Sequence, residues 1–460
     1  MRFLWIVVVV LCLAGQAQAH AGDQGFVLLL PTDIYIWSGV ASVVLTVILL
    51  AVLPDRAGAA LFRPVRLWRW HGSGLRHWTS GGAALFLVLL VWAGLYGSRD
   101  PLVNPLPLVV WTVWWVILVS LQGVVMDHWR WTNPFTGPGA LMAHLTGERA
   151  PLRYPRALGY APGMVGFVAF AGFLLADIAP ADPARLAVVV GLYWLISLAG
   201  LCLFGPRWLV RAECVTMLMR SFARMAIVGR HRGRLALGLP GWQLLARRPM
   251  PMGGAIFALL LLAVGSFDGL NETFWWLGVL GLNPLEFPGR SAVVGPTLAG
   301  LCLSVAGLLL IFVACTWLGL IMAQARGRLA LAVRVFAPAI LPIALGYHIA
   351  HYITSFLVDG QYALAALSDP LNQGADLLGL GQYSVSTGFL NVAGQVRAIW
   401  LTQAGAVVIG HVIAIILAHV LALRLVADAR GAVLSQVPLA VFMVGYTFFG
   451  LWLLAAPRGF

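Results

Sequence analysis

The chain has 460 residues, of which 61% are hydrophobic and 10% are charged, and its mean hydropathy is +0.91. About a quarter of the residues of a soluble globular domain are charged, so soluble enzyme folds are excluded. A net charge of +13 would suggest a nucleic-acid partner in a soluble protein. Here the arginines fall in alternate connections between apolar runs, as in a polytopic membrane protein, so no nucleic-acid partner is expected.

The amino terminus reads as a secretory signal peptide. An early arginine and an apolar core precede Ala17-Gln18-Ala19, an A-x-A cleavage site. Cleavage after Ala19 removes residues 1–19 and leaves 20–460 as a single helical membrane domain. It also makes His20 the first residue, whose α-amine and imidazole can bind one metal ion together. The alternative is that His20 follows the cleavage site by chance.

The apolar runs predict an all-α fold, a polytopic bundle of transmembrane helices. A span needs about 20 apolar residues, and ten runs approach that length. They are 33–53, 80–97, 108–126, 158–177, 186–204, 253–271, 295–322, 334–357, 399–423 and 437–455.

The positions of the arginines predict the orientation. Most of them fall in five connections that the positive-inside rule assigns to the cytoplasm: 55–79, 127–157, 205–252, 323–333 and 424–436. Both ends of the mature chain then face the periplasm, with the protein in the inner membrane. The connection 205–252 is amphipathic and predicts a segment along the anionic inner leaflet; the alternative, which we prefer, is that its arginines only anchor the topology. A break at Asn283-Pro284 within 272–292 predicts a short helix on the outer surface.

Histidines inside two consecutive spans predict a metal site. At 1.5 Å per residue, His348 and His351 lie about 14 and 9 Å below the outer end of their span, and His411 lies about 18 Å below the outer end of the next. Consecutive helices are usually neighbours, so the three imidazoles are expected to converge on zinc or copper, with His20 as a further ligand. His419 lies too deep to share the ion. The alternative is that each histidine only hydrogen-bonds a neighbouring helix.

A long periplasmic segment, 358–398, follows the two histidines. Loops of this length are uncommon unless they cover a site, so we expect a lid. Asp359 and Asp369 in this segment are the candidate catalytic carboxylates, as proton acceptors or to orient a water molecule. Asp33 and Asp268 approach the same face from other spans.

Several stretches resemble a bacterial membrane protein family that includes fenitrothion hydrolase. They are "HYITSFLVDGQYALAALSDPLNQGADLLG" from His351, "GHVIAIILAH" from Gly410, "AHAG" after the signal, "NPF" at 133–135, "FGPRWLVRAE" at 204–213 and "FDGLNET" at 267–273. The resemblance covers most of the chain and implies an organophosphate-degrading enzyme of the inner membrane. It implies no catalytic residues, so the candidate residues rest on the spacing alone.

Two functions from different classes follow. The first is a metal-dependent hydrolase of aryl phosphotriesters and thiophosphates, in which the metal lowers the pKa of its water and polarises the ester. The second is a membrane protein that handles or transports copper or zinc without hydrolysis. A structural subunit without chemistry is a third reading. The sequence does not decide between a monomer, a homo-oligomer and a hetero-oligomer, and it contains no H-E-x-x-H, G-x-S-x-G, P-loop or Rossmann signature.

Overall fold

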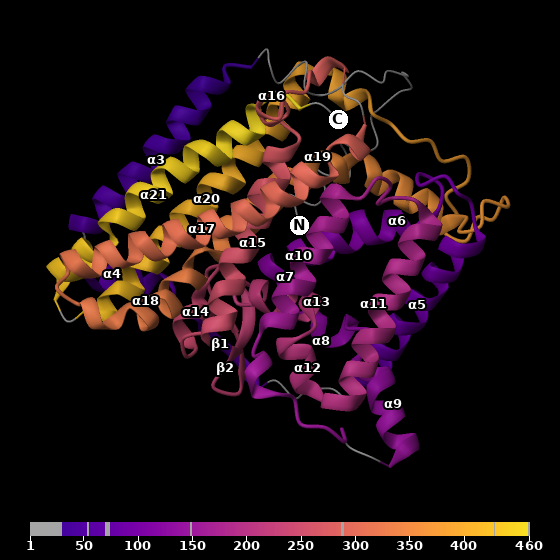
Figure 1. Cartoon of the computed structure of the whole chain (residues 1–460), viewed down its shortest axis with the longest axis horizontal. Coiled ribbons are helices and arrows are strands. Elements are labelled where there is room, and N and C mark those ends of the chain that lie inside the picture. Colours follow the sequence, from indigo (N-terminus) through magenta and orange to yellow (C-terminus); the bar gives the residue numbers. More distant parts are fainter. Residues whose placement is uncertain are drawn as a thin grey trace.

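The structure is a computed structural model that describes residues 30–52, 55–69, 74–147, 150–286, 289–426 and 428–458. The signal peptide and His20 lie outside the described residues, so both stay predictions. The described chain is mostly helical, as the apolar runs predict (Figure 1).

Nine described segments are long and apolar enough to cross a membrane. This confirms a polytopic helical bundle. They are α3 (Thr32–Val52), α5 (Arg76–Tyr96), the continuous run α6, η1 and α7 (Pro105–Val124), α11 (Pro183–Phe204), α15 (Met252–Asn271), α17 (Val294–Met322), the run Arg326–Ser368 that ends in α19 (Leu341–Ser368), α20 (Ala393–Leu425) and α21 (Ala429–Ala455).

The tenth predicted span is a shorter helix, α10 (Ala161–Ala176). Its 16 residues extend about 24 Å, less than the roughly 30 Å of a hydrocarbon core. It still runs alongside α15 from one end of the bundle to the other. Tyr160 packs at Gly253, where α15 begins, and Arg290 binds the last carbonyls of α10 at the opposite end.

The helices form two lateral groups around a buried centre. In Figure 1, α3, α20 and α21 lie side by side on one flank, and α5, α11 and α9 (Thr136–Thr146) lie on the other. Between them α15 packs against α19, and fifteen of the twenty residues of α15 are buried. A polar residue on α15 is therefore removed from lipid.

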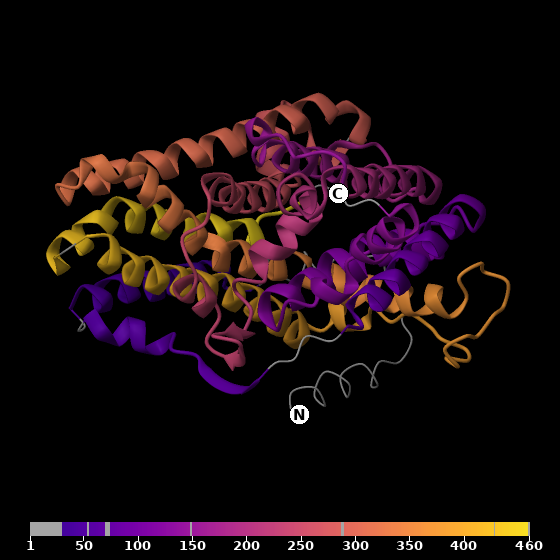
Figure 2. The ribbon, with the colours of Figure 1, turned by 90° about the horizontal axis from the view of Figure 1, so that it is seen from below.

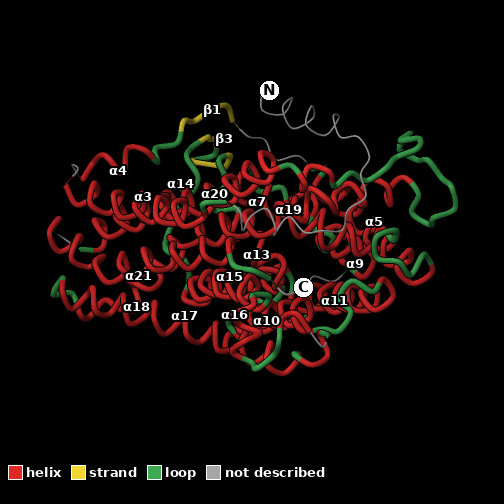
Figure 3. Tube along the Cα trace, turned by 90° about the horizontal axis from the view of Figure 1, so that it is seen from above, coloured by secondary structure: helices red, strands yellow, loops and turns green. Residues whose placement is uncertain are grey.

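The five arginine-rich connections meet at one end of the molecule, as their shared side in the prediction requires. The first and third form a small sheet of order β1-β3-β2 from β1 (Val65–Arg69), β2 (Val228–His231) and β3 (Arg234–Leu237), seen at the edge of the helical body in Figure 3. Arg424 Nη1 donates to Leu245 O at 2.7 Å, and the Arg328 guanidinium donates to Leu425 O. We call this the arginine-rich end; its location at the cytoplasm stays a prediction.

The connection 205–252 differs from the expectation of a segment along the leaflet. Its helix α13 (Cys214–Phe222) is almost entirely buried, packed against α7, α10 and α15. Glu213 caps the helix by accepting the N–H groups of Val215 and Thr216, and burial raises the pKa of this carboxyl. The amphipathic pattern therefore reflects burial within the protein. The predicted short helix within 272–292 is present as α16 (Phe274–Val279), and its location on the outer surface stays a prediction.

Candidate functional site

An aspartate lies in the buried centre of the bundle. Asp268 is near the end of α15 and only 6% exposed. A charged side chain within a membrane span is costly and is usually paired. The position of Asp268 therefore requires partners from a neighbouring helix.

Helix α19 supplies these partners from two consecutive residues. The Asp268 Oδ2 atom lies 3.4 Å from His351 Nε2 and also accepts a hydrogen bond from the Tyr352 hydroxyl. The His351 ring stacks on Tyr347, with centroids 5.7 Å apart, and meets the edge of Tyr352 at 4.6 Å. Both aromatic rings thus hold the imidazole against the carboxylate.

The second histidine of α19 binds a different helix. His348 Nε2 lies 2.8 Å from Trp115 O, and the two rings meet edge to face at 5.0 Å. Trp115 belongs to η1 (Val109–Leu118), a ten-residue π-helical segment. Wider turns of this kind are rare and occur often at functional sites.

A small cavity joins these residues. It has a volume of about 30 Å³ and is lined by Asp268, His348, His351, Tyr352 and Trp115, with apolar side chains of α10 opposite. A cavity that accommodates a water-sized sphere with polar partners can hold one water molecule. The space is far smaller than the several hundred Å³ of a typical ligand pocket.

A second carboxylate follows one turn after Asp268. Glu272 Oε2 lies 3.5 Å from Arg458 Nη1, and the backbone around Arg458 pairs with Thr273. Residues four apart share a helix face, so Glu272 lies above Asp268 on the same side of α15. Burial raises the pKa of Glu272. The carboxylates thus form a column from the end of α15 to the cavity.

His411 is not among the residues that line this cavity. Its Nδ1 atom lies 2.9 Å from Val407 O of its own helix. The reason is the rotation of α19 against α20, which cross closely at two glycines: a Cβ at Gly346 would lie 2.4 Å from Ala406 O, and one at Gly410 would lie 2.6 Å from Pro342 O. Because Gly346 faces α20, His348 lies about 200° further around α19, on the other side.

The two candidate carboxylates of the segment 358–398 also lie elsewhere. Helix α19 continues to Ser368, so Asp359 is part of the helix and the segment that follows is shorter than expected. Asp369 accepts the N–H groups of Gln373 at 2.9 Å and Gly374 at 2.7 Å. It organises the turn after α19, and this loop extends from the body of the molecule in Figure 2. Neither aspartate lines the cavity.

The described residues do not fit a bound metal. No group of three or more His, Cys, Asp or Glu side chains among them is arranged to hold an ion. His348 and His351 share a cavity, but Nε2 of each is directed to a protein oxygen. Zinc or copper with His20 as a ligand stays a prediction, because His20 lies outside the described residues.

These features define the chain as a multi-span helical membrane protein with a buried acid–base cluster at its centre. No family model, no curated protein and no solved structure matches it.

Sequence reasoning missed Tyr352, Trp115 and the pairing of Asp268 with His351. The available signal was the small residue Gly346, since small residues mark the close side of a membrane helix crossing. It would have indicated that His348 and His351 face away from α20, on the side of α19 where the structure places Asp268. Chemically, the cluster can accept a proton at His351 and stabilise the resulting charge with Asp268.

Proposed function

We propose that the protein is a membrane-embedded hydrolase of apolar organophosphorus esters, with Asp268 and His351 as its acid–base pair. The observation that carries the acid–base role is the 3.4 Å contact between Asp268 Oδ2 and His351 Nε2 in a nearly inaccessible position. The substrate class, aryl phosphotriesters and thiophosphates, is implied by the resemblance of the sequence to the family that includes fenitrothion hydrolase.

The carboxylate assigns the role of each imidazole nitrogen. When Nε2–H donates to Asp268, Nδ1 carries the lone pair and is the basic atom. Nδ1 is buried and accepts no hydrogen bond from the described residues, so it is available to a water molecule in the adjoining cavity. A base within hydrogen-bond reach of water is the requirement for general-base catalysis.

The reaction then balances without a metal. His351 Nδ1 takes a proton from water as the water oxygen attacks phosphorus, and the P–O bond to the aryl group breaks. The phenolate leaves with the electron pair of that bond and receives the proton later. Asp268 stabilises the imidazolium in the meantime, as the aspartate of a catalytic triad does.

The ester would approach from the lipid side of α10. One face of this helix, with Phe167, Phe170 and Leu174, lines the small cavity. Its other face, with Val168 and Phe173, lines an apolar groove of about 680 Å³ against α15 and α17. Helix α10 thus separates the small polar cavity from a groove of ligand size. The proposal requires α10 to move, because the cavity itself does not admit the ester.

The test is hydrolysis of a thiophosphate with a nitrophenol leaving group by the purified chain in lipid vesicles. His351→Gln and Asp268→Asn are expected to lower kcat by about 10²- to 10⁴-fold, the usual contribution of a general base. His411→Gln is the matched control, because His411 is as buried as His351 and lines no part of the cavity. Full activity in both cavity variants would refute the pair. Inhibition by chelators would instead favour the metal-dependent form with His20.

A further inference from the structure

A cavity of about 1160 Å³ lies at the arginine-rich end, lined by other residues than the Asp268 cluster. Its walls come from α9, α13 (Cys214–Phe222), α12 (Pro206–Arg211) and the last turn of α11. Six arginines line it: Arg76, Arg130, Arg220, Arg224, Arg230 and Arg247. They belong to three connections that are far apart in the sequence, so the fold gathers them here.

The positive charge of this arginine cavity is largely uncompensated. Asp127 is the only acidic residue among the described residues that line it, and its Oδ2 atom lies 2.7 Å from Arg130 Nε. Asp127 also accepts from Gln122 Nε2 at 2.9 Å, which fixes the carboxylate in place. With one carboxylate and six guanidinium groups, the cavity carries a net positive charge that an anion could compensate.

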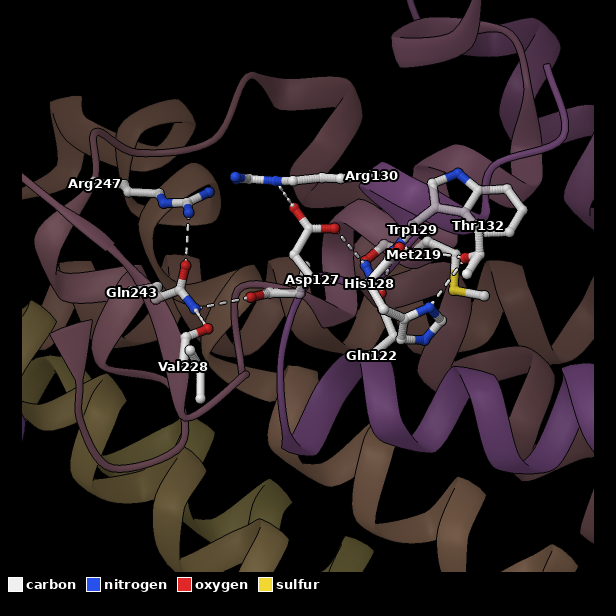
Figure 4. Close-up of polar contacts among 11 residues, drawn as sticks. Gln122, Asp127, His128, Trp129, Arg130, Thr132, Met219, Val228, Gln243 and Arg247 are labelled. Atoms are coloured by element: carbon white, nitrogen blue, oxygen red, sulfur yellow. Dashed lines mark hydrogen bonds and ion pairs between the residues drawn. The ribbon is translucent and has the colours of Figure 1, made fainter. Parts of the chain in front are cut away.

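Two of the arginines are aimed at each other. Figure 4 shows the Arg130 and Arg247 side chains extended toward one another, with Asp127 beside Arg130. Arg247 Nη2 donates to Gln243 Oε1 at 2.6 Å, and Gln243 Nε2 in turn donates to Ala226 O at 2.9 Å. This chain of hydrogen bonds holds Arg247 in a position that like-charge repulsion alone would disfavour.

The third arginine of the group is the most enclosed. Arg224 is half-buried and lies on the wall of both this cavity and an adjoining one of about 210 Å³. Burial and the neighbouring charges of Arg247 and Arg220 lower the pKa of Arg224 to about 10. Its guanidinium therefore keeps its charge near neutral pH while it is partly withdrawn from water. A bound anion would repay this cost.

Part of the remaining wall of the cavity is apolar. Leu201 and Leu203 from the end of α11, with Met142 from α9, belong to this part. On the outside of α9, Leu141 is 58% exposed and Leu145 is 70% exposed, as expected of a helix that faces lipid. A ligand with both a charged and an apolar part matches these walls.

We propose that the arginine cavity binds the phosphate group of an anionic membrane lipid, with Arg130, Arg224 and Arg247 as its ligands. Guanidinium groups bind phosphate oxygens through paired, charge-assisted hydrogen bonds. The apolar part of the wall favours a lipid as the carrier, because a small soluble phosphate ester would leave Leu203, which is 42% exposed, in contact with water. At this end the positive-inside rule places the inner leaflet, which supplies anionic headgroups.

The test uses the full chain in nanodiscs of phosphatidylcholine, with phosphatidylglycerol or inorganic pyrophosphate added in separate arms. Bound lipid is counted by native mass spectrometry, and Tm is followed by tryptophan fluorescence. The double variant Arg224→Gln/Arg247→Gln is expected to bind phosphatidylglycerol at least tenfold more weakly than the native chain. The matched control is Arg430→Gln, which removes an exposed arginine of the same end that lies outside both cavities.

The outcomes separate a site from general attraction to anionic lipid. Equal loss of phosphatidylglycerol in the double variant and in Arg430→Gln would overturn the proposal, because charge alone would then explain the binding. A Tm increase with pyrophosphate and none with phosphatidylglycerol would overturn the lipid assignment. Should the double variant melt early in phosphatidylcholine alone, the single variant Arg130→Gln replaces it, since Arg130 is a proposed ligand that lines the cavity with an exposed side chain.

Discussion

The two ends of the molecule use charge in opposite ways. At the end that carries Glu272, three described arginines have carboxylate partners: Arg99 with Asp182, Arg185 with Asp177, and Arg458 with Glu272. Arg290 at this end binds the last carbonyls of α10 instead. At the arginine-rich end, Arg130 with Asp127 is the one ion pair that the described residues form. Of the other arginines there, Arg328, Arg334 and Arg424 bind backbone carbonyls, and five more line the arginine cavity with Arg130.

The charged residues at the two ends therefore have different roles. Arginines without a carboxylate partner at one end are what the positive-inside rule expects of a cytoplasmic end, and they are open to anions from outside the protein. Paired charges at the other end satisfy each other and continue inward to Asp268. Substitutions at the paired end should therefore alter stability, whereas those at the arginine-rich end should alter binding more than stability.

The largest loss of stability is expected for Asp268→Ala. The substitution leaves the His351 imidazole and the Tyr352 hydroxyl without their shared acceptor in a buried position. Removing one partner of a buried pair costs about 3–5 kcal/mol. Unfolding in a denaturing detergent series measures it. Arg99→Ala at the same end is the control, because Arg99 is two-thirds exposed and such pairs are worth about 1 kcal/mol or less. Equal losses in the two variants would contradict the distinction.

A smaller loss, of about 2 kcal/mol, is expected for Arg290→Gln. Arg290 donates to the carbonyl oxygens of Leu174, Leu175 and Asp177 at 2.8–2.9 Å, which closes the last turn of α10. A cation at this position also opposes the negative end of the helix dipole. Thermal unfolding compared with Arg430→Gln provides the measurement. If Arg290→Gln and Arg430→Gln lowered the stability by the same amount, substitutions at the two ends would not differ in their effect on stability.

The spans were predictable because a membrane imposes them on the sequence. A helix that satisfies its own backbone in lipid must show a long apolar run, and nine of the ten runs are long helices in the structure. That the five arginine-rich connections lie on the same side was also predictable, because the prediction depends only on where the arginines occur in the sequence. The short α10 is the exception, because its neighbours and Arg290 support it at both ends.

The candidate site was less predictable because it depends on helix rotation. Adjacency of α19 and α20 was expected and observed, yet Gly346 and Gly410 set the rotation that separates His348 and His351 from His411. The contact of α15 with α19 joins residues more than 80 positions apart, which no local spacing specifies. His348 and His351 were identified from polarity in an apolar run; Asp268 was noted without its partner, and Tyr352 was not noted.

The smallest effect is expected at the ion pair of the mostly buried Asp177 and the half-exposed Arg185, and it depends on pH. Burial alone would raise the pKa of Asp177. Hydrogen bonds from Arg185 at 2.7 and 3.0 Å and from the Ala179 N–H lower the pKa by more than burial raises it, so it lies below its usual value. A carboxyl with a lowered pKa stabilises the fold above its unfolded pKa near 4, and this contribution is lost as the pH falls through the lower folded value. The Tm difference between the native chain and Asp177→Asn should therefore shrink from pH 6 to pH 3.

Because Arg185 is about half exposed, solvent screening keeps this difference below that of Arg290→Gln. A difference that stayed constant over this range would mean that Asp177 acts through the Ala179 turn and not through its charge.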